Sequence, residues 1–349
     1  MSCTCFIVPT DVLKRFAADP ELSEELRRGF DYSAAISSQL RVVREQRAEL
    51  SLMLMQLPAP FARATPLPKL HALPANHVYD LHHGTTLPGT QVANPGSSTD
   101  GSIKRAYTEA EAVAKFYWDI FKRDSLDNQH MTLISSAHYS TNFNNAAWTG
   151  GQMYYGDGDG QIFVDFTLGN DVIGHELTHG VTQHSAGFAY SNEPGGLNEG
   201  MSDIFGSMFR QWQAGQDVNA ADWLIGHDII GPLARTRGFT CLRNMANPAD
   251  SHALAPQPTH FSQYHAGMDP HYSSGIPNFA FYKTAKAVGG HSWEKVGQVW
   301  YKALTTPPPN PNMHMVQFAN LTRSLSHSMY PTTPAVHNAV DAAWTAVGL

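Results

Sequence analysis

Apolar residues recur three and four positions apart in several long stretches of the chain, which is the spacing of an amphipathic helix. Near the N-terminus this pattern covers residues 11–30 and 32–56. After residue 170 it predicts six further helices, over residues 171–184, 197–214, 275–288, 291–304, 313–328 and 334–347. The second half of the chain is therefore expected to be largely helical.

The stretch from residue 76 to residue 170 has a different pattern and is rich in Gly, Asn, Thr, Tyr and Asp. Its short apolar runs predict strands, at residues 131–138 and 161–166. One helix is expected over residues 108–122, with Thr108 as its N-cap and Glu111 as the capping-box partner.

A β-rich half followed by a helical half predicts an α+β fold of two lobes with a cleft between them. Residues 57–74 contain five prolines, which disfavour helix and sheet and predict an extended linker. Exposed linkers are common sites of proteolysis. The expected organisation is a helical N-terminal segment at 1–56, the linker at 57–74, a β-rich lobe at 75–184 and a helical lobe at 185–349.

Charge and cysteine content narrow the class of protein. The net charge is −7 and there is no basic cluster, so neither nucleic acid nor an anionic membrane is expected as a partner. Three cysteines do not make a disulfide framework. The N-terminus lacks a basic start and a sustained apolar core, so we expect no signal peptide and a protein that is cytoplasmic as synthesised. Export by a route without an N-terminal signal stays open.

The motif with the most chemical information is His-Glu-Leu-Thr-His, which runs from His175 to His179. Residues four apart share one face of a helix, so both imidazoles can bind one metal ion. Glu176, beside the first histidine, can then reach a metal-bound water. The alternative interpretation is two ordinary histidines on a helix surface.

A catalytic zinc ion needs a third protein ligand and one open position. Glu199 comes twenty residues after His179, where the sequence predicts a helix that starts after the run from Pro194 to Gly196. It lies four residues before Asp203, on the same helix face. Glu199 can bind the metal, and Asp203 can accept a hydrogen bond from a metal-bound histidine and fix its tautomer. The combined spacing favours this interpretation over a solvated first helical turn.

These motifs and several others resemble the thermolysin-like neutral zinc metallopeptidases, from about residue 76 to the C-terminus. The other matching segments are residues 144–148 with 155–160, and residues 187–190, 242–245 and 271–276. The resemblance implies a β-rich N-terminal lobe and a helical C-terminal lobe, with the zinc helix lining the cleft. It also implies one catalytic Zn²⁺ ion, bound by His175, His179 and Glu199.

The same resemblance implies the roles of further residues. Glu176 is expected to act as general base, and Tyr190 and His271 to donate hydrogen bonds to the developing oxyanion. Substrate is expected to add as a strand beside Asn145 and Ala146. The pocket for the side chain just after the cut is implied at Phe163, Val172 and Leu242, near Arg243. The expected activity is therefore an endopeptidase that cleaves before Leu, Phe, Ile or Val.

The loop before His271 departs from the family pattern. The family has an orienting aspartate five residues before this histidine, where the present chain has Ala266. Asp269 is a candidate for the same role, but its place before Pro270 leaves the geometry open. A poorly oriented His271 would weaken catalysis without abolishing it.

The paired calcium site of thermolysin is also altered. Asp171 and Asp222 match two of its carboxylates, but Arg210, Leu224 and His227 stand at three other positions. An arginine can supply the positive charge directly. We therefore expect no calcium at this site and an ion pair between Arg210 and either Asp171 or Asp222.

The N-terminal segment resembles the short propeptides of the protealysin branch, which begin with a Pro-containing apolar motif. The run Cys-Phe-Ile-Val-Pro at residues 5–9 fits that start. A thiolate is a strong zinc ligand and can displace the catalytic water. Cys5, or alternatively Cys3, is therefore expected to block the zinc until the linker is cut; the other interpretation gives these cysteines no such role.

Expected partners are peptide or protein substrates, with the N-terminal segment as an intramolecular inhibitor of a monomeric enzyme. Two alternatives stay open. The first is a metal-binding protein with little catalytic power that acts by binding a partner, which the altered loop before His271 favours. The second is an aminopeptidase of the same zinc class, for which the sequence shows no acidic motif upstream of the zinc helix.

Overall fold

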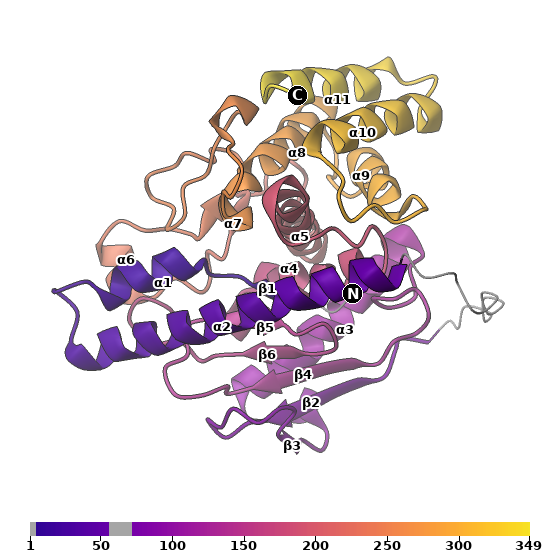
Figure 1. Ribbon diagram of the computed structural model, residues 1–349. Helices are drawn as coiled ribbons and strands as arrows, with labels where there is room; N and C mark the ends of the chain where they lie inside the picture. The colour runs from indigo at the N-terminus through magenta and orange to yellow at the C-terminus, as the bar shows by residue number, and fades with distance from the viewer. Residues whose placement is uncertain (1–4, 56–71) are drawn as a thin grey trace.

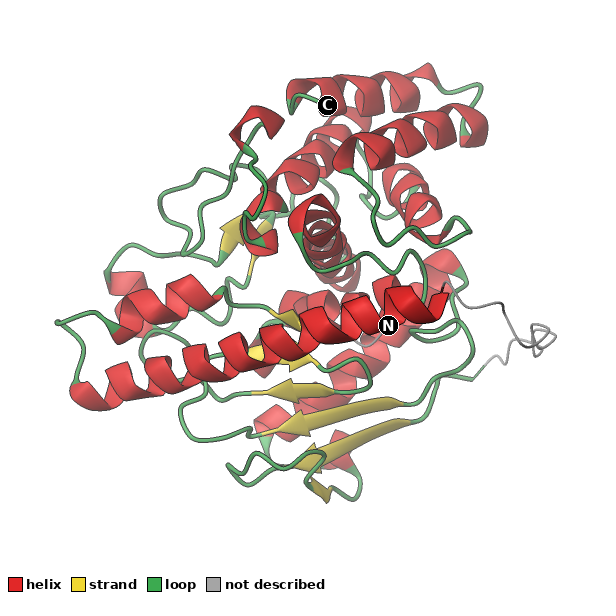
Figure 2. Ribbon diagram, viewed as in Figure 1, coloured by secondary structure: helices red, strands yellow, loops and turns green. Residues whose placement is uncertain are grey.

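A computed structural model describes residues 5–55 and 72–349 of the chain. The strands of the main sheet gather in one part of the molecule, and a group of helices with a short two-stranded ribbon forms the other part (Figure 1, Figure 2). This arrangement confirms the predicted α+β fold, with a β-containing N-terminal lobe and a helical C-terminal lobe. Cys3 and residues 57–71 of the predicted linker lie outside the described residues.

A six-stranded mixed sheet has the order β1-β5-β6-β4-β2-β3. Its strands are β1 (Cys5–Phe6), β2 (Asn76–Asp80), β3 (Thr90–Gln91), β4 (Leu133–Ala137), β5 (Ala146–Trp148) and β6 (Met153–Tyr155). Neighbouring β2, β4 and β6 are parallel, and the remaining pairs are antiparallel. The first strand of the chain therefore completes a sheet whose other strands all follow the linker.

The strand predicted at 161–166 is wrong. In this stretch only Phe163 forms a bridge, with Ile230, and a short 3₁₀ helix η2 (Phe166–Leu168) follows. The carboxylate of Asp159 accepts the backbone N–H groups of Gln161 and Ile162, at 2.7 Å each. These N–H groups are thus satisfied locally and are not offered to a neighbouring strand.

Helix α3 (Gly101–Phe121) packs against β2 and β4. It begins earlier than predicted, because the side chain of Asp100 accepts the N–H groups of Ser102 and Ile103 and caps the helix there. Thr108 lies inside the helix, so the predicted capping box is wrong.

Helices α4 (Asn170–Gln183) and α5 (Asn192–Ala214) pack against each other. The histidine pair of the predicted metal site lies on α4, and the acidic pair Glu199 and Asp203 lies on α5. The predicted start of α5 is wrong, because the run from Pro194 to Gly196 is helical. A proline is tolerated there, since the first helical N–H groups have no acceptor within the helix. A Cβ at Gly196 would lie only 2.5 Å from Oγ of Ser273, so this glycine permits close packing.

The remaining helices complete the C-terminal lobe. They are α6 (Pro232–Thr236), α7 (Pro270–Ser273), α8 (Gly275–Val288), α9 (Lys295–Thr305), α10 (Met315–Met329) and α11 (Pro334–Ala346), with a two-stranded ribbon of β7 (Leu224–Ile225) and β8 (Arg243–Asn244). The prediction for α8 matches, whereas α9 begins later than its predicted start at residue 291. Across the described ranges, no helix combines the length and apolarity needed to cross a membrane.

The N-terminal segment forms α1 (Thr10–Ala17) and α2 (Glu24–Met55), and α2 lies across the front of the molecule in Figure 1. Two helices were expected, but the predicted boundary near residue 31 is wrong. The break comes at Asp19 and Pro20, because the ring of a proline disfavours the helical conformation of the residue before it. Phe30 lies within α2 and is fully buried.

Side chains of this segment contact both lobes. Ser33 accepts the backbone N–H of Asn144 in the sheet lobe, at 3.1 Å. Asp19 forms an ion pair with Arg237, and the hydroxyl of Tyr272 donates to Asp11. The N-terminal segment therefore spans the space between the two lobes.

Candidate active site

Three buried side chains on two adjacent helices converge on one point. His175 and His179 lie on α4, Glu199 lies on α5, and their ligand atoms all lie within 4.8 Å of one another. This is the one such group of His, Cys, Asp and Glu side chains in the described ranges. The two Nε2 atoms are 3.1 Å apart, and they lie 3.4 and 3.5 Å from the Glu199 oxygens.

This geometry fits a zinc ion. Donors at zinc-bond length in a tetrahedral site are separated by roughly 3.3–3.5 Å, close to the distances observed. Oε2 of Glu199 is buried without a hydrogen-bond donor, as expected of an oxygen that faces a cation. The donor set of two imidazoles and one carboxylate is that of a catalytic zinc site.

The opposite nitrogen of each imidazole is held by α5. Nδ1 of His175 lies 2.8 Å from Asp203, and Nδ1 of His179 lies 2.8 Å from the side-chain oxygen of Asn198 and 3.0 Å from Ser202. These contacts leave both Nε2 atoms directed at the shared point. Sequence reasoning missed Asn198 and Ser202, although they lie four apart beside Glu199 on the same helix.

Asp203 links His175 to Arg243. Its two carboxylate oxygens accept hydrogen bonds from Arg243, at 2.8 Å each, and both residues are fully buried. Burial alone raises the pKa of Asp203, but Arg243 and His175 outweigh it and lower that pKa to about 2. Asp203 is therefore ionised and orients both the histidine and the arginine.

Glu176 lies one residue from the first histidine and is fully buried. One carboxylate oxygen accepts the backbone N–H of Trp148 at 2.9 Å, and the other has no hydrogen-bond partner in the described structure. Burial holds the pKa of Glu176 well above its usual value. A buried carboxyl with one free oxygen beside the metal donors is suited to accept and return a proton.

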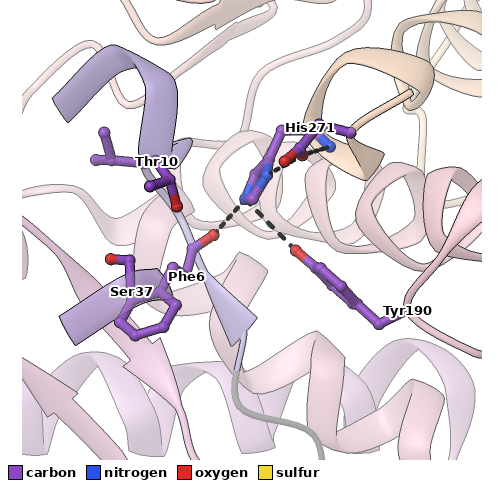
Figure 3. A pocket seen from close by; sticks show the side chains of 7 residues that line it. Phe6, Thr10, Ser37, Tyr190 and His271 are labelled. Atoms are coloured by element: carbon purple, nitrogen blue, oxygen red, sulfur yellow. Dashed lines mark hydrogen bonds and ion pairs between the residues drawn. The ribbon is translucent and has the colours of Figure 1, made fainter. Parts of the chain in front are cut away.

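Two further predicted side chains lie next to these donors. The hydroxyl of Tyr190 donates to Glu199, and its oxygen lies 3.4 Å from Nε2 of His271. Nδ1 of His271 lies 2.7 Å from Asp269. Figure 3 shows Nε2 of His271 between the hydroxyl of Tyr190 and the backbone carbonyl of Phe6, which accepts a 2.6 Å hydrogen bond from that nitrogen.

The N-terminal segment occupies the place expected for a peptide. The N–H of Ile7 donates to the carbonyl of Ala146 at 3.3 Å, and Arg243 donates to the carbonyl of Ile7 at 3.0 Å. The side chain of Asn145 accepts the N–H of Val8 at 3.0 Å and donates to its carbonyl at 3.2 Å. Backbone atoms of residues 7 and 8 therefore use the residues predicted to bind substrate.

Phe163, Val172 and Leu242 are fully buried and belong to the same hydrophobic core as Ile7. The ring of Phe163 lies 6.3 Å from that of Phe30 in α2. Their role as a pocket for the side chain after the cut stays a prediction.

The predicted ion pair of Arg210 is confirmed. Its guanidinium lies 3.8 Å from Asp171 and 3.5 Å from Asp222, and it forms a closer pair with Asp228. Asp171 is fully buried, whereas the other two carboxylates are partly exposed. One arginine thus faces three carboxylates at the place that matches the paired calcium site of thermolysin, where we expected no calcium.

Two family models match this chain. Residues 69–183 match the thermolysin metallopeptidase catalytic domain, and residues 186–349 match the thermolysin metallopeptidase alpha-helical domain. The chain belongs to the thermolysin metallopeptidase family. It is therefore a thermolysin-like metalloendopeptidase, of a family that uses catalytic zinc.

Similar proteins agree with this membership. An extracellular metalloprotease of Pectobacterium carotovorum subsp. carotovorum is 39% identical over 313 residues, covering 86% of this chain and 87% of that protein. Protease PrtS of Photorhabdus sp. (strain Az29) is 37% identical, covering 78% and 76%. The solved structure of the precursor of protealysin, a metalloproteinase from Serratia proteamaculans, has a TM-score of 0.82 at 32% identity and covers 99% of both chains.

These comparisons correct one prediction about this thermolysin-family chain. A cytoplasmic location was expected because the N-terminus shows no signal sequence. That prediction is wrong, because a similar protein is named an extracellular metalloprotease. The absence of a recognisable N-terminal signal is weak evidence for a cytoplasmic location, because such a signal is only one of the ways in which a protein is exported.

Proposed function

We propose that this protein is a zinc endopeptidase that cleaves before bulky hydrophobic residues, and that residues 1–56 are a propeptide that holds it latent. The observation that carries the proposal is the peptide-like docking of residues 5–8, whose backbone pairs with β5 and with the side chains of Asn145 and Arg243. A peptide substrate cannot take the same place while this segment is bound.

His175, His179 and Glu199 would hold the zinc ion. When bound, the ion would act as a Lewis acid, which polarises the substrate carbonyl and lowers the pKa of a coordinated water. As a water attacks the carbonyl carbon, Glu176 takes up the proton that this water loses, at its unpaired oxygen, and returns it to the amine that leaves when the C–N bond breaks. His271 and Tyr190 donate hydrogen bonds to the carbonyl oxygen of the reacting bond as negative charge develops there.

The chain's own residues also position the peptide. Ala146 and Asn145 pair with backbone atoms on the two residues after the cut, as they do with Ile7 and Val8. Arg243 donates to the carbonyl of the first of them. An apolar pocket of Phe163, Val172 and Leu242 would receive the side chain of that residue, for which a β-branched or larger apolar side chain is suited.

The specificity is tested with peptides that differ only in the residue after the cut, given to protein cut within the linker. Peptides with Leu, Phe, Ile or Val after the cut are expected to be cleaved. The peptide with Asp in that position is expected to have a kcat/KM at least 100-fold lower. Equal rates with Leu and Asp would refute the apolar pocket. Val172→Asp tests the same pocket from the side of the enzyme, because it places a charge among the residues that line it. Val316→Asp places a charge at an exposed site and is the control.

We also propose that the Cys5 thiolate binds the zinc in the latent form. Cys5 is fully buried and pairs in register with Trp148, whose N–H contacts the catalytic Glu176. X-ray absorption of the zinc-loaded intact chain is expected to show one sulfur scatterer at about 2.3 Å. Cys5→Ser should remove it, whereas Cys241→Ser should leave it. Nitrogen and oxygen scatterers alone would refute this role.

The site around Arg210 is proposed to work without calcium. Its guanidinium supplies positive charge to three carboxylates at once, so a divalent ion would have to displace it. This proposal is tested by the thermal unfolding experiment described below.

A further inference from the structure

Residues 5–8 lie in the site in a defined register, which identifies the bond that corresponds to the one cut in a substrate. The Phe6 carbonyl faces His271, and the following residue, Ile7, donates to Ala146 and accepts from Arg243. On the proposed function, on which this inference rests, Phe6 therefore stands for the residue before the cut and Ile7 for the residue after it.

The side chain of Phe6 points to the face of the sheet opposite to that of its neighbours Cys5 and Ile7, because side chains alternate along a strand. On that face Phe6 pairs in register with Ala147, and Ala147 pairs with Tyr154 on the next strand. The three residues form one row across β1, β5 and β6.

The small side chain in the middle of this row creates a space. Strands two apart in a sheet are separated by about 10 Å, too far for two side chains to meet across a large intervening residue. Because Ala147 has only a methyl group, the rings of Phe6 and Tyr154 reach a centroid distance of 6.5 Å at 82°. This edge-to-face arrangement is a favourable one for aromatic rings.

Other apolar residues close the space. Leu81, Tyr139 and Phe143 join Phe6, Ala147 and Tyr154 in a hydrophobic cluster that is separate from the main core. The ring of Tyr139 lies 4.4 Å from that of Tyr154 and 4.8 Å from that of Phe143. Phe6 is only 2% exposed within it. Both Phe6 and the partly buried Ile36, which packs on the same cluster, belong to the proposed propeptide.

We infer that this cluster is a second specificity pocket, which receives an aromatic side chain on the residue immediately before the cut bond. Removal of residues 1–56 takes away Phe6 and Ile36 and leaves an apolar recess, walled by Tyr154, Tyr139 and Phe143 and floored by Ala147. Peptides with Phe or Tyr before the cut bury a ring there. Selectivity then comes from both sides of the bond, with an aromatic residue before it and an apolar residue after it.

The test uses protein cut in the linker and freed of its N-terminal piece, with two peptides that differ only in having Phe or Ala before a Leu. The Phe peptide is expected to have about a 10-fold or greater advantage in kcat/KM. In Ala147→Phe the new ring fills the recess, so this advantage should fall below twofold while the Ala peptide is still cut. Leu168→Phe adds a ring at an exposed site and should keep the full advantage.

A binding measurement on the unaltered pocket keeps the inference falsifiable if Ala147→Phe does not fold. The probe is a synthetic copy of residues 4–9 with Ala in place of Cys5, so that no thiol can bind zinc, titrated into cut Glu176→Ala protein. Changing Phe6 to Ala in this peptide should raise the Kd at least 10-fold. Equal Kd values, or equal kcat/KM for the Phe and Ala peptides, would overturn the pocket. Absence of cleavage of either peptide by the wild-type cut protein, with the 10-fold difference in Kd retained, would instead refute the proposed endopeptidase activity.

Discussion

The Nδ1 atom of His271 lies 2.7 Å from Oδ1 of Asp269, two residues earlier in the chain. The same carboxylate accepts the backbone N–H of His271 at 3.0 Å and caps the short helix α7. Proline at the next position is compatible with this geometry, because the first helical residue needs no N–H donor. Asp269 therefore orients the histidine from a position where sequence reasoning left the geometry open.

Replacing this carboxylate tests whether the contact matters for catalysis. Asp269→Ala is expected to lower kcat by about 10- to 100-fold with little change in KM, because His271 loses its orientation toward the reacting carbonyl. Steady-state kinetics on the linker-cut protein measure both constants. Asp119→Asn, which removes an exposed charge on α3, serves as control. A kcat within twofold of wild type would show that Asp269 has no positioning role.

If the N-terminal segment holds the enzyme latent as proposed, charge contacts between this segment and the C-terminal lobe are expected to contribute to the latent state. Arg237 pairs with Asp19, which is partly buried, and lies 3.2 Å from the exposed Glu21. Loss of such a pair costs about 1 kcal/mol, so Arg237→Ala should raise the residual activity of the intact chain about fivefold. Arg28→Ala breaks an exposed pair inside the segment and should have no effect. Unchanged activity in both variants would mean that the pairing of β1 with β5, and not these charge contacts, maintains latency.

Arg210 is expected to replace calcium as the counter-charge of Asp171. Arg210→Ala leaves a buried carboxylate uncompensated and should lower the free energy of unfolding by about 2 kcal/mol. The variant should then gain thermal stability on addition of millimolar calcium, whereas the wild-type protein should not. Differential scanning calorimetry with and without calcium measures both. Calcium-dependent stabilisation of the wild type that disappears in Asp171→Asn would contradict this account.

A second ionic cluster predicts a pH dependence of stability. His138 contacts Asp157 at 2.9 Å and Asp100, the N-cap of α3, at 3.1 Å, with His83 and Asp80 nearby. The hydrogen bond to Asp157 is the largest influence on His138 and outweighs burial, so its pKa rises from 6.5 to about 9. Because the folded-state pKa is raised, this stabilisation is complete below about pH 6.5 and is lost as the pH rises through 9.

The variant His138→Gln should therefore be less stable than wild type by about 1–2 kcal/mol at pH 6, after allowance for solvent screening. The difference should shrink toward zero at pH 10. Thermal unfolding at a series of pH values checks this, with the exposed His265→Gln as control. A difference that does not depend on pH would mean that His138 contributes packing and not charge.

The parts of the site that depend on local sequence could be predicted. His175 and His179 share a helix face because of their spacing, and Glu199 and Asp203 do so for the same reason. The start of α5 could not be predicted, because the two glycines after Pro194 lie in the helix where it packs closely against Pro270 and Ser273 of α7. Local propensity carries no information on such contacts between distant segments.

The docking of the N-terminal segment shows the same limit. The alternation of Cys5, Phe6 and Ile7 is too short to predict a strand, and β1 exists because β5 offers an unpaired edge. The ring contact between Phe6 and Tyr154 depends on the small size of Ala147, and no pattern in the sequence indicates that the three residues lie in one row.

The most direct test of the central claim compares the intact chain with protein cut in the linker, measuring zinc content and peptide turnover of each. The account predicts one zinc per chain in both forms, turnover only after the cut, and loss of that turnover in Glu176→Ala with the zinc retained. Stoichiometric zinc without turnover in either form would contradict it, and would favour a metal-binding protein that acts by binding a partner.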